Sequence, residues 1–144
     1  DEANGRIYVF REWGDTGKTN QELAAIITSL GFAKSVIVAD SSEQKSIEEM
    51  KRLGIMRIKP SVKGPDSVVH GIQKLQNYEI IVHPNCSGLI TEFENYSWSK
   101  NKDGEYVNKP IDAWNHYIDS LRYSLQAVDN SKKLKTMSKA SLSL

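Results

Sequence analysis

The spacing of hydrophobic and polar positions alternates between strand-like and helix-like segments along most of the chain. Residues 6–13 are β-branched and aromatic and follow a turn-like segment, which predicts a strand forming the second arm of a hairpin. The capping-box residues Thr19 and Glu22 predict a helix that ends at Gly31. A continuous apolar run at 36–39 then predicts a strand buried on both faces.

The same alternation continues towards the C-terminus. The further predicted elements are a helix from Ser41 or Ser42 to Leu53, a strand at 55–59, a helix from 65 to about 77, a strand at 79–83, a helical segment at 86–95, a small β-hairpin near 95–108 and a long amphipathic helix from Ile111 to about Val128. Strands that alternate with helices in this way predict an α/β fold with parallel strand pairs.

The length of 144 residues predicts a single domain, with no room for an ATPase motor beside a second catalytic module. We assign that domain to residues 1–128. Residues 129–144 are rich in Ser and Lys and have little to bury, so we expect a flexible basic tail there. A predicted strand follows within a few residues of Asp1, and we interpret the chain as a fragment of a longer protein.

The composition limits the classes of partner and compartment. With 19 Lys and Arg against 18 Asp and Glu, the net charge of +1 gives no strong global field, so a DNA partner would need a local basic patch. No apolar run approaches the roughly 20 residues that a membrane helix requires, so we expect no membrane partner. A single cysteine and the absence of a signal peptide favour a reducing cytoplasm.

Acidic residues at two places are candidates for catalytic or metal-binding chemistry. Asp40 directly follows the strand at 36–39, where ligands of open α/β sheets bind; the alternative is a simple helix cap. Asp112, His116 and Asp119 are spaced i, i+4 and i+7, on one face of the last predicted helix; the alternative is a solvated polar face. Together with Asp40 these side chains would form an oxygen-rich cluster suited to Mg²⁺ or Mn²⁺.

Lys59 and Lys63 supply the local positive charge that the overall balance lacks. Both lie near the end of a predicted strand and are candidates for binding DNA phosphates, although solubility alone also explains them. The segment 14–19 ends in Gly-Lys-Thr but has only two residues between its glycines, which excludes a Walker A loop. His70 and His83 are ambiguous: lone histidines on otherwise apolar segments are more often structural than ligands, and no Ser-His-Asp or Cys-His arrangement surrounds them.

Three segments in order carry a more specific signal. They read VIVADSS at 36–42, KPSVKGPDS at 59–67 and PIDAWNHYIDSLRY at 110–123. Together they resemble the nuclease domain of the large terminase subunit of tailed bacteriophages, most closely its PBSX-like prophage branch. The resemblance implies an RNase H-like mixed sheet flanked by helices. It also implies a metal-dependent endonuclease, a hydrolase that cuts concatemeric double-stranded DNA during packaging.

The resemblance also implies roles for individual residues. Asp40 and Asp119 would be catalytic metal ligands, His116 a metal ligand or proton-transfer group, and Asp112 a weaker, outer ligand. A site with two Mg²⁺ or Mn²⁺ ions would then hydrolyse the DNA backbone. The implied partners are double-stranded DNA, the portal protein, the small terminase subunit and the ATPase domain of the full-length protein, in the cytoplasm of a bacterial host.

One departure from the family lies at the N-terminus. The family pattern begins with a strand that carries a further catalytic Asp, and this chain starts near the turn into the third strand. We therefore expect the domain to lack its first one or two strands, to bind metal weakly and to cut poorly. Two other functions stay open: a truncated, catalytically inactive remnant or assembly module that docks on the portal or motor, and a resolvase-like or RNase H-like nuclease unrelated to packaging.

Overall fold

The computed structural model describes residue 1 and residues 3–141, with side chains up to residue 128. This part of the chain has an α/β fold, and it forms two compact units. The first unit comprises Asp1–Gly14 and Gly64–Arg122, and the second comprises Asp15–Lys63 and the chain from Tyr123 onward.

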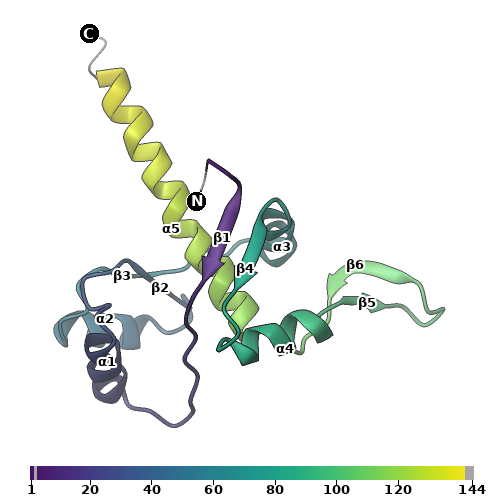
Figure 1. Ribbon diagram of the computed structural model, residues 1–144, viewed down its shortest axis with the longest axis horizontal. Coiled ribbons are helices and arrows are strands. Elements are labelled where there is room, and N and C mark those ends of the chain that lie inside the picture. The colour runs from purple at the N-terminus through teal and green to yellow at the C-terminus, as the bar shows by residue number, and fades with distance from the viewer. Residues whose placement is uncertain (2, 142–144) are drawn as a thin grey trace. The chain divides into compact units, whose positions relative to one another are not determined.

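The first unit contains a parallel strand pair. Strand β1 (Arg6–Val9) lies beside β4 (Glu79–Val82), with Arg6 opposite Glu79 (Figure 1). The predicted strand at 6–13 is therefore shorter than expected, and its described partner is a parallel strand, not the first arm of a hairpin. The other elements are α3 (Ser67–Gln76), α4 (Ser87–Asn95), β5 (Trp98–Lys100), β6 (Tyr106–Pro110) and the start of α5 (His116–Ser141).

The predicted hairpin near 95–108 is confirmed. Strands β5 and β6 pair in antiparallel fashion and extend from the end of α4 (Figure 1). The turn between them contains Gly104 at φ 82°, a left-handed conformation that glycine adopts without steric cost. Lys100 lies over the ring of Tyr106, with its Nζ 4.8 Å from the ring centroid.

The second unit holds a compact apolar core. Helix α1 (Asn20–Ser29) begins with the predicted capping box, since the Thr19 hydroxyl accepts from Glu22 N and the Glu22 carboxylate accepts from Thr19 N. Strands β2 (Ile37–Ala39) and β3 (Ile58–Pro60) pair in parallel, as the alternation of elements predicts. The buried core residues of this unit come from α1, α2 (Gln44–Arg52), the segment leading into β3 and β3 itself: Ala24, Ile47, Met50, Ile55 and Ile58.

Two boundaries in the second unit differ from the prediction. Helix α2 begins after Glu43 and not after Ser41 or Ser42, because residues 40–43 form a turn in which Glu43 N donates to Asp40 O. Strand β3 begins at Ile58 and not at Ile55. The N–H of Ile55 donates to Met50 O as the chain leaves α2, and its fully buried side chain belongs to the core.

Helix α5 is displaced at both ends relative to the predicted helix at 111–128. It begins at His116 and continues to Ser141. The side chains of the predicted basic tail at 129–144 lie outside the described part, so its flexibility stays a prediction. Among the described helices, none combines the length and the apolar character needed to span a bilayer.

Candidate functional site

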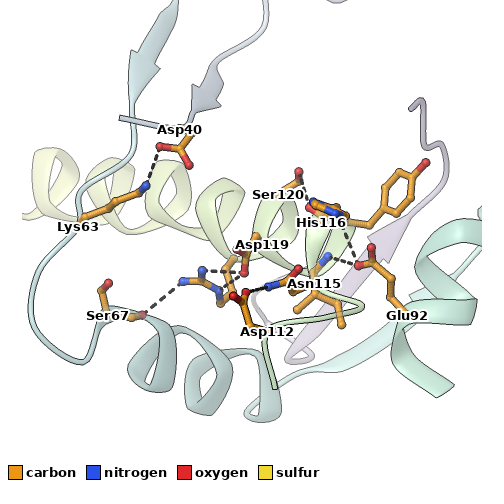
Figure 2. Close-up of polar contacts among 12 residues, drawn as sticks. Asp40, Lys63, Ser67, Glu92, Asp112, Asn115, His116, Asp119 and Ser120 are labelled. Carbon is orange, nitrogen blue, oxygen red and sulfur yellow. Dashed lines mark hydrogen bonds and ion pairs between the residues drawn. The ribbon is translucent and has the colours of Figure 1, made fainter. Parts of the chain in front are cut away.

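Asp40 lies directly after β2, where the sequence places a candidate ligand. Its Oδ1 accepts a hydrogen bond from Lys63 Nζ at 2.6 Å (Figure 2). It accepts a second from Ser42 N at 2.8 Å, and both partners belong to the second unit. The bond from Lys63, and after it the backbone bond from Ser42, lower the pKa of Asp40 from 3.8 to about 2. The carboxylate is therefore ionised at neutral pH.

Ser61 fixes the backbone around Asp40 and was not singled out by the sequence analysis. It follows β3 and is buried, with 4% of its surface exposed. Its N–H donates to Ala39 O at 2.7 Å, and its Oγ accepts from Ser41 N at 3.2 Å. These bonds tie the residues on both sides of Asp40 to the end of β3. Only the position of Ser61 two residues after the predicted strand at 55–59 signals this role.

The ion pair of Asp40 predicts a small, pH-dependent contribution to stability. Because the folded pKa lies below the ordinary value, the stabilisation is fully present above about pH 4 and is lost as the pH falls through about 2. The Asp40 side chain is 41% exposed, so solvent screening limits the effect of Asp40→Asn to less than about 1 kcal/mol at pH 7. Urea unfolding at pH 7 and below pH 2 measures this; an equal difference at both pH values would contradict it.

The segment before α5 explains why the helix starts five residues later than predicted. Trp114 has φ 57°, a left-handed conformation that is incompatible with a continuing α-helix. The helix begins after Asn115, whose carbonyl accepts from Asp119 N at 2.7 Å. Asp112 therefore lies in the preceding loop, where its Oδ1 accepts from Asn115 Nδ2 at 3.4 Å. Of the three residues predicted to share a helix face, only His116 and Asp119 lie on α5.

Carboxylates of neighbouring segments cap two helices of the first unit, α4 and α5. Glu92 on α4 is 6% exposed, and its Oε2 accepts from the N–H groups of Tyr117 and Ile118, at 2.8 and 2.9 Å (Figure 2). These amides belong to the first turn of α5, which would otherwise leave them without acceptors. Glu12, after β1, binds the N–H groups of Gly88 and Leu89 at the start of α4 in the same way.

The first turns of α5 present His116 and Asp119 to different cavities of the first unit. Asp119 lines a cavity of about 580 Å³ together with Asp112 and Asn115. His116 is exposed and lines a cavity of about 590 Å³ with Trp114. Oδ1 of Asp119 accepts two hydrogen bonds from Arg122, a residue that the sequence analysis did not consider.

The ligand chemistry of the two principal acids suits a hard divalent cation. In the part of the chain that the structure describes, no three His, Cys, Asp or Glu side chains form a ready metal-binding group. The hydrogen bonds of Asp119 go to Oδ1, and none among the described residues reaches its Oδ2. Asp119 therefore keeps one anionic oxygen for a ligand such as Mg²⁺ or Mn²⁺, whereas the carboxylate of Asp40 is bound by Lys63 and Ser42.

The chain is similar to large terminase subunits. Residues 1–127 match the family described as Terminase RNAseH like domain. The large terminase subunit of Bacillus phage SPP1 is 34% identical over 129 residues, which cover 88% of this chain and 31% of that protein. The PBSX phage terminase large subunit of Bacillus subtilis (strain 168) is 24% identical over 120 residues, covering 83% and 28%. The chain thus spans about 30% of the length of these relatives.

One solved structure is similar to this chain over most of the length of both. It is the crystal structure of the g2p (large terminase) nuclease domain from the bacteriophage SPP1 with bound Mn. The similarity has a TM-score of 0.82 at 34% sequence identity, and it covers 88% of this chain and 73% of that one.

Proposed function

Because the chain belongs to the terminase RNase H-like domain family, we propose that it is the divalent-metal-dependent endonuclease domain of a phage DNA-packaging terminase. The observation that carries the proposal is the match, at TM-score 0.82 and 34% identity, to a large terminase nuclease domain solved with bound Mn. The same match confirms the RNase H-like fold predicted from the sequence. The proposed substrate is concatemeric double-stranded DNA.

The proposed catalytic residues are Asp40, Asp119 and His116, with Asp112 as an outer ligand. When bound, two Mg²⁺ or Mn²⁺ ions would lower the pKa of an attacking water and stabilise the leaving 3′ oxygen. Asp119 would offer Oδ2 to such an ion, and Asp40 would offer a carboxylate oxygen. The exposed imidazole of His116 would serve as a further ligand or accept a proton. The assignment of these residues to one reaction rests on the order of their motifs in the family.

Lys59 and Lys63 are the proposed DNA contacts. Lys59 lies within β3, and Lys63 follows in an exposed loop with its ammonium group paired to Asp40. We propose that both contact backbone phosphates, with Lys63 also neutralising Asp40. Phosphate contacts carry no base information, so the proposed cleavage would have little sequence preference.

The proposed setting is the packaging motor in the cytoplasm of the bacterial host. There the partners would be the ATPase domain of the full-length protein, the small terminase subunit and the portal protein. These assignments follow from the similarity to large terminase subunits, of which this chain spans about 30%.

Metal-dependent nicking of plasmid DNA tests the proposed function. The purified chain, incubated with supercoiled plasmid, is expected to produce nicked circles with MnCl₂ or MgCl₂ and none with excess EDTA. Addition of excess metal should restore cleavage. Because the chain is expected to lack the first strand and its Asp, weak cleavage by it alone agrees with the proposal. Nicking that persists in excess EDTA, or that is equal in the unmodified, Asp40→Ala and Asp119→Ala chains, would contradict it.

A further inference from the structure

Arg122 is a buried cation on α5, one helical turn after Asp119. Its side chain is 5% exposed, against 31% for that of Asp119. Its Nε and Nη2 both donate to Asp119 Oδ1, at 3.1 and 2.8 Å, and its Nη1 donates to the carbonyl of Ser67 at 3.4 Å (Figure 2). A buried guanidinium held by several acceptors keeps a fixed orientation, because moving its charge away from them is costly.

Helix α3 supplies the space in which this guanidinium lies. Gly71 faces Arg122, and a Cβ at that position would lie 2.8 Å from Arg122 Cδ and 3.0 Å from Nη1. Such separations are shorter than carbon contacts allow, so a side chain at position 71 would displace the arginine. Ser67, on the same helix, provides the carbonyl that binds the third nitrogen. Gly71 and Ser67 together form a socket for Arg122.

We propose that Arg122 is a positioning residue that orients Asp119 for metal binding, and that α3 holds it in place through this socket. The inference rests on the proposed function, since that function assigns Asp119 to the metal ions. Two donors fix Oδ1 of Asp119, and no hydrogen bond among the described residues reaches Oδ2. This orientation of the carboxylate leaves Oδ2 of Asp119 available to bind a cation.

The guanidinium has two effects of opposite sign on metal chemistry. Its two donors orient the carboxylate, which cleavage requires because the reacting groups must be held in a narrow geometry. Its positive charge lies beside the proposed ligand and repels a divalent cation. Loss of the orientation should therefore lower the cleavage rate, and loss of the positive charge should raise the metal affinity. If Arg122 served only in folding, its replacement would not raise the metal affinity.

Two measurements on the same samples separate these effects. Titration with MnCl₂, monitored by electron paramagnetic resonance, gives the Mn²⁺ affinity, and plasmid nicking gives the cleavage rate. Arg122→Gln removes both orientation and charge, so Mn²⁺ affinity should rise about 3- to 10-fold while the cleavage rate falls about 10-fold. Arg122→Lys keeps the charge but loses the planar pair of donors. Its Mn²⁺ affinity should stay within about twofold while cleavage falls similarly.

Lys51→Gln is the matched control. Lys51 pairs with Glu48 at the same i,i+3 spacing, on the exposed surface of α2, so this variant loses the same charge from an ion pair that does not include Asp119. Lys51→Gln should change neither the Mn²⁺ affinity nor the cleavage rate by more than about twofold. Should Arg122→Gln fail to fold by circular dichroism, Gly71→Ala tests the same socket with the arginine retained, and its cleavage rate should fall.

Three results would overturn the proposal. They are an Arg122→Gln chain that binds Mn²⁺ no more tightly than Lys51→Gln, an Arg122→Lys chain that cleaves at the unchanged rate, and an unmodified chain that does not bind Mn²⁺. If the unmodified chain binds Mn²⁺ but does not cleave DNA, that result concerns the nuclease function of the fragment and not the role of Arg122. The order of the Mn²⁺ affinities then still decides whether Arg122 acts on Asp119.

Discussion

Replacement of Asp119 by Asn is expected to lower the rate of metal-dependent DNA cleavage by about 100-fold or more. The substitution removes the anionic ligand but keeps its shape, and its amide oxygen still accepts a hydrogen bond from Arg122. The start of α5 should therefore stay folded, so the loss reports on chemistry. Initial rates of plasmid nicking in MnCl₂, with thermal unfolding of the same samples, measure both properties.

Asp112→Asn is the matched control for this prediction. Asp112 lines the same cavity as Asp119 but lies in the loop before α5, paired with Asn115. As an outer ligand it should contribute less, and its replacement should lower the rate by less than about 10-fold. An Asp119→Asn chain that cleaves within threefold of the unmodified rate would remove Asp119 from the proposed catalytic residues. Equal losses in both variants would place Asp112 beside it as a direct ligand.

The sequence predicts correctly those elements whose signals are local. The capping box at Thr19 and Glu22 fixes the start of α1 with two hydrogen bonds across three residues. The turn at Gly104 joins two strands that are close in sequence. Asp40 lies at the end of a strand, as the apolar run before it indicates. Each feature depends on residues only a few positions apart.

Features that depend on distant residues were not predicted from the sequence. The partner of β1 lies 73 residues along the chain, where the side chains of Arg6 and Glu79 form an ion pair. The position of Arg122 depends on a missing side chain at Gly71, and one sequence alone does not relate the two. The late start of α5 did have a local signal, because Asn115 is a favoured helix-capping residue. The helical spacing of apolar residues from Ile111 onward nevertheless led to a predicted helix start at Ile111.

Glu92 shows most clearly how the fold supports the candidate site. Its residue type favours an exposed helix surface, and in sequence it does not differ from Glu94 two positions later. In the structure it is buried and accepts from two backbone N–H groups 25 and 26 residues away, in the turn that begins with His116. A carboxylate at a helix N-terminus also interacts favourably with the helix dipole. One side chain of α4 therefore fixes the turn that carries His116 and leads to Asp119.

Glu92→Ala is accordingly expected to lower the free energy of unfolding by about 3 kcal/mol, because two buried amides lose a charged acceptor. Glu92→Gln keeps an acceptor oxygen but loses the charge, and should cost about 1 kcal/mol. Glu94→Ala, at an exposed position of the same helix, should stay within about 0.5 kcal/mol. Urea unfolding followed by circular dichroism gives all three values. If Glu92→Ala and Glu94→Ala lose the same stability, Glu92 does not anchor α5, and the order of the site must come from other contacts.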